Sequence, residues 1–420
     1  MSKSPVWHPF HQHGLGEDIP LVTHAEGAVL HTADGRRVID AISSWWVTTH
    51  GHNHPRIMQA VREQTEKLDQ LIFAGWTHEP AETLARGLVD IMPDGLDHVF
   101  YSDSGSTSVE VALKMALGYW HNRGEPRHRV LVMEHSYHGD TIGAMSVGER
   151  GVFNRAYEAL LFDVGTVPFP GSFPQPTYDA LERFCGEGDA AAFIVEPLLL
   201  GAGGMLTYPP AVLAEMRAIC ARHGVLFIAD EVMTGWGRTG TLLACEQAGV
   251  TPDILCLAKG LTGGSMPLAV TMATAPIFDA HYSSDRSKMF FHSSSFTANP
   301  IACAAAVANL AIWREEPVLD RIATLSARLG DKLDALSQHN QVINARQCGT
   351  MIAFDVEVGD DAGYLADIGP RLRGHFFAND VLIRPLGNTV YTMPPYCISQ
   401  KDIDCVANVI AAGVESCARS

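Results

Sequence analysis

The sequence lacks C-x-x-C pairs, long uncharged apolar runs and runs of basic residues. Its nine cysteines, an odd number, are typical of the reduced thiols of a cytoplasmic enzyme. Without an apolar span of about 18 residues no transmembrane helix is predicted, and the N-terminus has no apolar core of a signal peptide. Only 30 basic residues stand against 47 acidic ones, and the net charge of −17 argues against nucleic acid and anionic membranes as partners.

The chain has 420 residues, which is more than a single core usually holds, so two lobes are expected. From about residue 80 to 300, short apolar runs alternate with helical patterns. The apolar runs cover 98–101, 130–133, 192–195, 225–229, 254–258 and 268–272. This alternation predicts an α/β fold with a mostly parallel sheet covered by helices.

The two ends of the chain carry shorter patterns. Residues 28–46 predict short strands around a turn at Asp34-Gly35, and residues 55–71 have helical spacing. The C-terminal part predicts a long helix after 302, two strands and a last helix, at 351–356, 390–393 and 400–417. Because the N-terminal part is too short to fold alone, we expect it to pack with the C-terminal part. The expected division is a large domain, 61–305, and a small domain formed by 1–60 and 306–420.

Two charged residues end apolar runs. Asp230 closes L-F-I-A-D and Lys259 closes I-L-C-L-A-K, so both are predicted at the ends of buried strands. A lysine there is costly to bury unless its charge is neutralised or used. One interpretation is a lysine that forms a Schiff base with pyridoxal phosphate (PLP), with the aspartate holding the pyridine nitrogen protonated. The other is a core lysine whose ammonium reaches solvent. Asp230 and the glycines at 260, 263 and 264, which leave room beside the amine, favour the cofactor.

A cofactor phosphate needs an anion site, and S-D-S-G-S-T at 102–107 is the candidate. This loop follows a predicted strand and precedes a helix with an apolar stripe, in which Thr107 and Glu110 form a capping-box pattern. Free N–H groups at a helix start, together with the positive end of the helix dipole, bind phosphate. Ligands of α/β sheets lie at the carboxyl ends of the strands, which supports this site.

Other polar residues follow predicted strands or turns. Tyr137 is placed to stack on a cofactor ring, and the alternative is an ordinary loop tyrosine. Glu196 ends F-I-V-E, and we expect it to pair with a buried donor rather than to take part in chemistry. The histidines at 50, 52 and 54 have no matching carboxylate or cysteine, so no metal site is predicted and a turn with solvated histidines is expected.

The long motif F-I-A-D-E-V-x-x-G-W-G-R-T-G, followed by P-D-I-L-C-L-A-K-G-L-T-G-G, resembles the signature of the class III PLP-dependent aminotransferases. The resemblance implies fold-type I, with a mostly parallel seven-stranded sheet flanked by helices and a smaller α+β domain. Further segments resemble the branch of that family that aminates 8-amino-7-oxononanoate to 7,8-diaminononanoate in biotin biosynthesis. They are W-H-P-F, S-S-W-W-V-T-T-H-G-H-N-H-P, Y-H-G-D-T-I-G-A-M-S-V and I-R-P-L-G-N-T-V-Y-T-M-P-P-Y.

The resemblance implies cofactor roles for the matching residues. Lys259 carries PLP and moves the proton, Asp230 pairs with the pyridine nitrogen, and Tyr137 stacks on the ring. The phosphate is bound by Gly105 and Ser106. Ser295, in F-H-S-S-S-F-T-A-N-P, is implied to complete the phosphate site of the neighbouring subunit, so the active sites of a homodimer would lie at its interface.

The resemblance also implies substrate residues: Trp45, Trp46, Phe10 and Arg384, the last for the substrate carboxylate. Phe10 stands where several members have a tyrosine, and Ser293-Ser294 replace the Gly-Pro of some members. The roles of Asp140 and Arg238 are left open. The identity of the amino donor, S-adenosylmethionine or lysine, is also left open. Because one site accepts two small-molecule substrates in turn, a ping-pong reaction is expected.

Three other functions compete with this hypothesis. A broad ω-amino-acid transaminase shares the cofactor motifs, and only the Trp45-Trp46 and R-P-L-G to M-P-P-Y segments speak against it. An intramolecular aminomutase uses the same scaffold without an external donor. A non-catalytic binding protein has no physical need for a buried lysine, so the presence of both Asp230 and Lys259 argues against it.

Overall fold

The computed structural model describes residues 4–417 and contains a central seven-stranded sheet with the order β4-β12-β11-β10-β7-β5-β6. Only β12 runs antiparallel to its neighbours, β4 and β11. The predicted mostly parallel sheet is therefore confirmed. The strands are β4 (His98–Ser102), β5 (Arg129–Met133), β6 (Gly165–Val167), β7 (Ala190–Val195), β10 (Leu226–Asp230), β11 (Ile254–Leu257) and β12 (Ala269–Ala273). All six apolar runs correspond to strands, whereas β6 was missed because it has three residues, one of them exposed.

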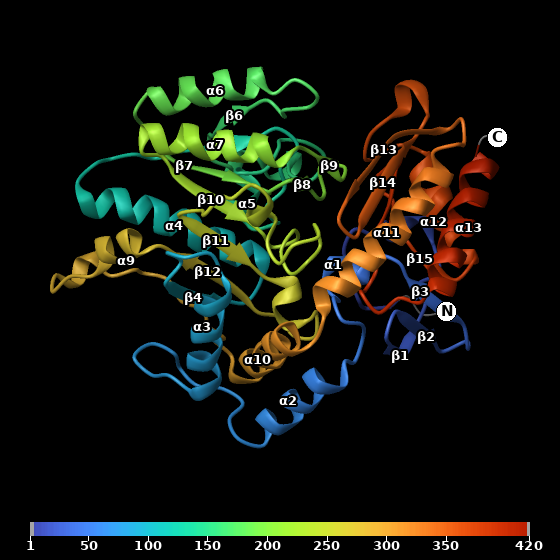
Figure 1. The fold of residues 1–420 in the computed structure, drawn as a ribbon, viewed down its shortest axis with the longest axis horizontal. Helices are drawn as coiled ribbons and strands as arrows, with labels where there is room; N and C mark the ends of the chain where they lie inside the picture. The colour runs from blue at the N-terminus through green and yellow to red at the C-terminus, as the bar shows by residue number, and fades with distance from the viewer. Residues whose placement is uncertain (1–3, 418–420) are drawn as a thin grey trace.

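Helices cover both faces of this sheet (Figure 1). Successive strand residues point to opposite faces, so Phe193 of β7 packs in one core cluster and Ile194 in another. The first cluster is closed by α3 (Glu79–Ile91), α6 (Gln175–Gly186), α7 (Pro210–His223) and α10 (Pro300–Glu315). The second is closed by α4 (Gly105–Arg123), α5 (Ile142–Ser146) and α9 (Ala275–His281). Burial on both faces explains why these strands are continuous apolar runs.

The two ends of the chain pack together (Figure 1). A four-stranded sheet has the order β1-β2-β3-β15, and the parallel pairing of β3 with β15 joins the N-terminal segment to the C-terminal part, as predicted. Its strands are β1 (Val22–Glu26), β2 (Val29–Thr32), β3 (Arg37–Asp40) and β15 (Val381–Leu382). The domain division at residues 60 and 305 stays a prediction.

A three-stranded antiparallel sheet and three long helices complete the C-terminal part. They are β13 (Val342–Cys348), β14 (Met351–Val356), β16 (Thr389–Thr392), α11 (Val318–Leu336), α12 (Ile368–Ala378) and α13 (Gln400–Cys417). The predicted strand at 351–356 and the last helix have the observed bounds, and the strand at 390–393 is shifted by one residue. The predicted helix at 55–71 is shorter, α2 (Pro55–Thr65). The short elements are α1 (Ser43–Trp46), α8 (Ala244–Gln247), β8 (Leu199–Leu200) and β9 (Leu206–Thr207).

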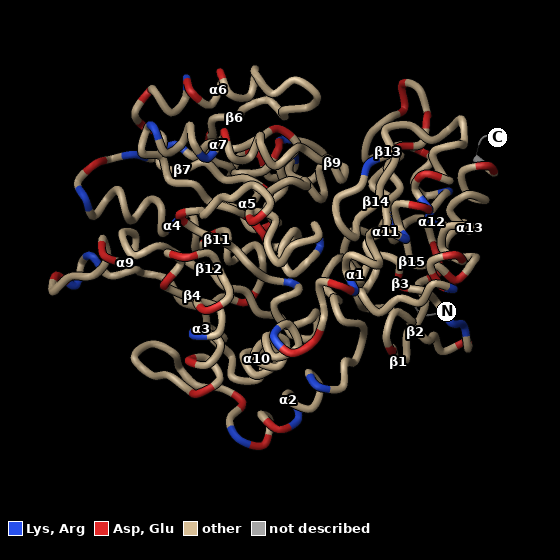
Figure 2. Tube along the Cα trace, in the orientation of Figure 1, with Lys and Arg blue, Asp and Glu red and all other residues tan. Residues whose placement is uncertain are grey.

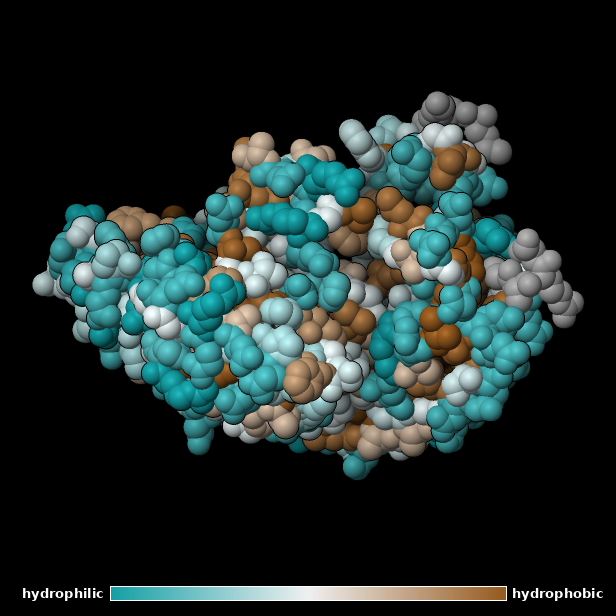
Figure 3. All heavy atoms as spheres, turned by 90° about the horizontal axis from the view of Figure 1, so that it is seen from above, coloured by the Kyte–Doolittle hydropathy of each residue, from teal (hydrophilic) through white to brown (hydrophobic). Residues whose placement is uncertain are grey.

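Charged residues are spread over the outer helices and loops, without a long basic stretch (Figure 2). Hydrophilic side chains cover most of the face seen in Figure 3, and hydrophobic ones show between them in patches. Among residues 4–417, no helix is long and apolar enough to cross a membrane.

Candidate active site

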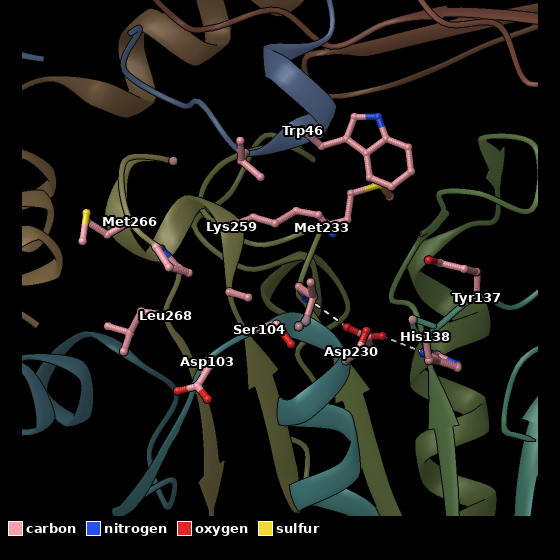
Figure 4. A pocket seen from close by; sticks show the side chains of 18 of the residues that line it. Trp46, Asp103, Ser104, Tyr137, His138, Asp230, Met233, Lys259, Met266 and Leu268 are labelled. Atoms are coloured by element: carbon pink, nitrogen blue, oxygen red, sulfur yellow. Dashed lines mark hydrogen bonds and ion pairs between the residues drawn. The ribbon is translucent and has the colours of Figure 1, made fainter. Parts of the chain in front are cut away.

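A cavity of about 410 Å³ lies at the carboxyl ends of the sheet strands. It brings together six of the predicted residues: Trp46, Gly105, Ser106, Tyr137, Asp230 and Lys259. In Figure 4 the Lys259 side chain lies between the Trp46 indole and the Asp230 carboxylate. Residues from separate strands meet here because parallel strands deliver their last residues to the same sheet edge.

Asp230 is the last residue of β10 and is almost fully buried. Its Oδ1 accepts a hydrogen bond from the Val232 N–H at 3.0 Å, and its Oδ2 lies 2.6 Å from Nδ1 of His138 (Figure 4). His138 is buried, and its Nε2 atom has no partner among the described residues. The sequence interpretation missed His138, although it follows Tyr137 in the loop after β5 and so had to reach the same edge.

Lys259 begins a short 3₁₀ turn (Lys259–Thr262), separated from the end of β11 by Ala258, and has a left-handed φ of 46°. Its Nζ lies 5.2 Å from the centre of the Trp46 ring. Burial lowers the pKa of the Lys259 amine below its usual value, and the carboxylates of Asp230 and Glu196 oppose that shift. A lysine with a lowered pKa has a larger neutral, nucleophilic fraction near neutral pH.

The glycines after Lys259 serve another purpose than the predicted one. At Gly260 an added Cβ would lie 2.6 Å from Cβ of Trp236, and at Gly263 the same distance from Cδ1 of Ile57. At Gly264, where φ is 89°, it would lie 2.5 Å from the Val47 carbonyl oxygen. The space beside these glycines is thus filled by protein, and they let the turn pack closely. Of the three, Gly264 also lines the cavity.

The start of α4 offers free backbone donors to the cavity. The capping box is formed by Ser104 and Thr107, not by Thr107 and Glu110 as predicted, because the helix starts at Gly105. Glu110 instead accepts hydrogen bonds from the Thr141 hydroxyl and the Gly143 N–H. The box satisfies the N–H groups of residues 104 and 107. Among the described residues no acceptor faces the N–H groups of Gly105 and Ser106, which line the cavity.

Tyr137 lines the first cavity and also a second one of about 300 Å³. Burial and the Asp140 carboxylate raise the pKa of its hydroxyl, so the group stays protonated and can donate. Asp140 is exposed, lines the second cavity, and donates its backbone N–H to the Ser106 hydroxyl at 3.2 Å. The aromatic rings of Phe153 and Tyr364, 4.5 Å apart, also line the second cavity.

Glu196 accepts hydrogen bonds from the backbone N–H groups of Tyr137 and Gly201, at 3.0 and 2.9 Å. It therefore pairs with buried donors, as predicted, and ties Tyr137 to the sheet. It also lines the cavity. Burial raises the pKa of this carboxyl to about 7.

Three of the predicted substrate residues form a cluster outside the lining of the two cavities. The Phe10 and Trp45 rings are 5.4 Å apart, the Arg384 guanidinium lies 5.7 Å from the centre of the Trp45 ring, and an Arg384 Nη2 donates to the Phe10 carbonyl. Phe10 is also 6.2 Å from Phe153 of the second cavity. Trp46 stays apart from this cluster, because it is buried and its Nε1 donates to the Tyr391 hydroxyl.

Ser295 does not line either cavity of its own chain and is exposed. Its carbonyl accepts a hydrogen bond from Gln70, and the neighbouring Ser294 hydroxyl donates to Asp103, which lines the first cavity.

The histidines at 50, 52 and 54 are not the solvated turn that was expected. His50 is buried and lies 2.9 Å from Oδ1 of Asn309, while His52 lies 2.8 Å from the buried Asp40 carboxylate. His54 is half-buried. Within residues 4–417 no group of histidine, cysteine and acidic side chains is arranged to hold a metal ion.

Arg238 is fully buried, and within the described residues its guanidinium donates to the backbone carbonyls of Trp46, Thr48 and Pro394. These bonds tie the segment that contains Trp46 and Thr48 to Pro394.

The family model of class III aminotransferases matches residues 14–414 of the chain. The adenosylmethionine-8-amino-7-oxononanoate aminotransferase of Synechococcus elongatus is 46% identical over 97% of both chains. The enzyme of the same name from Geobacter sulfurreducens is 37% identical over 95% of this chain and 93% of its own.

Solved structures of such enzymes superpose closely. The crystal structure of the adenosylmethionine-8-amino-7-oxononanoate aminotransferase from Methanocaldococcus jannaschii has a TM-score of 0.94, at 31% identity, over 98% of this chain and 97% of its own. A PLP-bound amine transaminase from an uncultivated Pseudomonas species has a TM-score of 0.92, at 30% identity, over 99% of both chains. With a strand-end lysine and aspartate in one cavity, the protein belongs to the class III aminotransferases.

Proposed function

We propose that this aminotransferase binds PLP in the first cavity and transfers an amino group to 8-amino-7-oxononanoate, giving 7,8-diaminononanoate in biotin biosynthesis. The observation that carries the proposal is that Lys259 and Asp230 face the same cavity as the free amides at the start of α4. The names of the relatives support the substrate and point to S-adenosylmethionine as donor.

The residues present fit PLP. The N–H groups of Gly105 and Ser106, unpaired within the described chain, suit the phosphate at the positive end of the α4 dipole. The Asp230 carboxylate suits a protonated pyridine nitrogen, and Tyr137 supplies a flat ring beside the cavity. Bound PLP supplies an aldehyde that condenses with amines and a pyridinium ring that accepts electrons.

The side chains around the cavity divide the remaining work. Lys259, whose amine has a lowered pKa, would hold PLP and would serve as the base that moves the proton of the substrate carbon. His138 orients Asp230 through the 2.6 Å contact between Nδ1 and Oδ2. Trp46 and Gly264 line the cavity beside the amine, and the Trp46 ring covers the amine at 5.2 Å.

We propose that the substrates occupy the second cavity and the cluster of Phe10, Trp45 and Arg384 beside it. Apolar rings suit the aliphatic chain of an oxononanoate. The guanidinium of Arg384 can grip its terminal carboxylate in a bidentate manner. Phe10 offers no hydroxyl, so it contributes apolar contact alone, and its backbone carbonyl holds Arg384 in place.

We also propose a homodimer in which Ser295 completes the phosphate site of the partner subunit. Two loops, 68–77 and 289–299, lie side by side, because Asn299 donates to the Asp69 carbonyl at 3.0 Å. Together they expose large apolar side chains, namely Ile72 at 65%, Trp76 at 66%, Met289 at 44%, Phe291 at 64% and Phe296 at 59%. Apolar surface of this extent beside a functional residue is typical of a protein interface.

For location, we propose the cytoplasm. All eight cysteines for which the structure describes the side chain are free thiols, five of them buried. Reduced thiols are typical of cytoplasmic proteins.

The proposed reaction is tested with the purified holoenzyme and 8-amino-7-oxononanoate as acceptor. S-adenosylmethionine, lysine and a simple ω-amino acid serve as donors in parallel, and product is followed by mass spectrometry. We expect 7,8-diaminononanoate with S-adenosylmethionine. Product with lysine alone changes the donor and keeps the rest of the proposal, whereas turnover of the ω-amino acid without use of the oxononanoate overturns it.

A further inference from the structure

Two turns of the site have unusual backbone conformations. Residues 43–46, which include Trp45 and Trp46, form a left-handed turn with φ values of 52°, 45°, 72° and 72°. Lys259 has a φ of 46°. Left-handed φ angles are unfavourable for residues other than glycine and persist only where the surroundings hold them. Something in the structure must therefore hold each turn.

The Lys259 turn is held by Asn309, a fully buried residue of α10. Its Nδ2 donates to the carbonyls of Gly260 and Leu261, both at 3.0 Å. Its Oδ1 lies 2.9 Å from Nε2 of His50. Because an amide oxygen only accepts, the His50 Nε2 carries the hydrogen and donates it. His50 thus fixes the orientation in which Asn309 presents both its donors to the turn.

Burial lowers the pKa of His50 to about 4, so the ring is neutral at physiological pH. A neutral ring with the hydrogen on Nε2 has no hydrogen on Nδ1. The contact with Asn309 therefore does not depend on a charged imidazole.

The tryptophan turn is held by Asp40, which is fully buried at the end of β3. Its Oδ1 accepts from the Ser44 N–H at 2.9 Å, and its Oδ2 accepts from the Ser44 hydroxyl at 2.8 Å. His52 completes the carboxylate, with Nε2 lying 2.8 Å from the same Oδ2. The other hydrogen bonds that the Asp40 carboxylate accepts within the described chain come from Ile42 and Ser44, a few residues along the chain.

Both histidines come from one short segment that needs a glycine between them. Gly51 has a φ of 98°, and a Cβ there would lie 2.6 Å from Sγ of Cys397 and 2.9 Å from Cα of Gly27. The residue between them is therefore fixed in place, while His50 and His52 reach two different turns.

We propose that His50 and His52 are positioning residues: through Asn309, His50 holds the turn that carries Lys259, and through Asp40, His52 holds the turn that carries Trp45 and Trp46. The inference rests on the proposed roles of Lys259 and the tryptophans. It assigns a purpose to the alternating histidine motif H-G-H, which neither metal binding nor solvation explains.

The test compares His50→Leu and His52→Leu with His50→Gln and His52→Gln, which keep a donor near the position of Nε2. The first readout is the rate at which the apoenzyme forms its yellow chromophore with PLP, together with the pH midpoint of the holoenzyme spectrum. The second readout is the steady-state kinetics with the keto substrate, in which a change in KM is distinguished from a change in kcat. We expect His50→Leu to slow chromophore formation about tenfold and to shift the midpoint. His52→Leu should raise KM about tenfold and change the first readout much less than His50→Leu does, because Trp46 lines the first cavity whereas Trp45 does not. Both glutamine variants should stay near wild type.

If each leucine variant moves both readouts alike, or neither, the assignment is overturned. If His50→Leu does not fold, His50→Phe gives the same decision, because it keeps a ring against Trp313 and Tyr396 and loses the Nε2 donor to Asn309. Failure of the proposed function looks different. In that case Lys259→Ala would still form a chromophore that borohydride traps, whatever the histidine variants do.

Discussion

Nδ1 of His138 lies 2.6 Å from Oδ2 of Asp230, with both side chains buried at the carboxyl edge of the sheet. The other nitrogen of His138 has no partner within the described chain, so this single contact orients the ring. Oδ1 of Asp230 is held from the backbone by Val232. A carboxylate held from two directions keeps its place when a cationic ring nitrogen approaches it.

The cofactor attachment can be checked chemically. The purified protein should be yellow, and borohydride should fix PLP on Lys259, because this amine faces the cavity and burial lowers its pKa. Peptide mapping locates the adduct. Lys114 and Lys288 are internal controls, since their amines contact the Phe291 and Asn122 carbonyls away from the cavity. An adduct on either would overturn the assignment of the site.

Replacement of Asp230 tests the electron sink. In Asp230→Asn the pyridine nitrogen loses its anionic partner, so we expect the barrier to rise by about 3 kcal/mol while PLP still binds. Single-turnover kinetics measure the loss. The matched control is Asp253→Asn, a carboxylate that pairs with Arg217 and the Phe227 N–H away from the cavity. Near-full activity of Asp230→Asn would refute the role proposed for this aspartate.

Arg384→Ala should separate the two half-reactions. In the half-reaction with the keto substrate, the free energy of substrate binding should become less favourable by about 2–5 kcal/mol, because the substrate carboxylate loses its charged partner. The half-reaction with the amino donor should change little. Stopped-flow absorbance of the cofactor follows each one separately. Arg86→Ala serves as control, since Arg86 is an exposed partner of Glu82. A defect confined to the donor half-reaction would assign Arg384 to the donor and strengthen the ω-transaminase alternative.

Ser295→Ala tests the shared phosphate site. If the hydroxyl binds the phosphate of the partner subunit, its removal should weaken PLP retention roughly tenfold, as expected for a hydrogen bond to a charged group. Equilibrium dialysis measures this. The control is Ser293→Ala, because the Ser293 hydroxyl donates to the Ser294 carbonyl.

Phe296→Asp tests the proposed subunit interface, because it places a charge on the exposed apolar surface. It should produce monomers that lose PLP. Monomers that keep full activity would contradict the proposal.

His50 should make stability depend on pH. Its pKa is lowered from 6.5 to about 4 in the folded protein, so between these values the unfolded chain binds more protons. The free energy of unfolding of the apoenzyme should therefore fall as the pH drops from 6.5 to 4, by about 3 kcal/mol from this residue. Urea unfolding of wild type and His50→Gln gives the difference, which cancels other titrations. Parallel curves for the two proteins would disprove it.

Local patterns were sufficient to predict the sheet and the two strand-end charges. A buried strand must be apolar on both faces, so β7, β10 and β11 are visible as runs, and Asp230 and Lys259 stand out where these runs stop. Strands of two or three residues are too short to form a recognisable apolar run. β6 and β15 have three and two residues, and β15 exists because it pairs with β3 across more than three hundred residues of chain.

The role of a single side chain was predictable where burial of that residue type is costly without a function, as for Lys259. Partners were not, because they come from distant segments: His138 reaches Asp230 across 92 positions, and His50 reaches Asn309 across 259. The left-handed turns at residues 43–46 and at Lys259 could not be predicted from local sequence either, because residues other than glycine rarely adopt this backbone conformation. They exist because Asn309, Asp40 and the glycine contacts hold them. The sequence by itself thus determined which groups the site contains, and only tertiary packing decided how they are oriented.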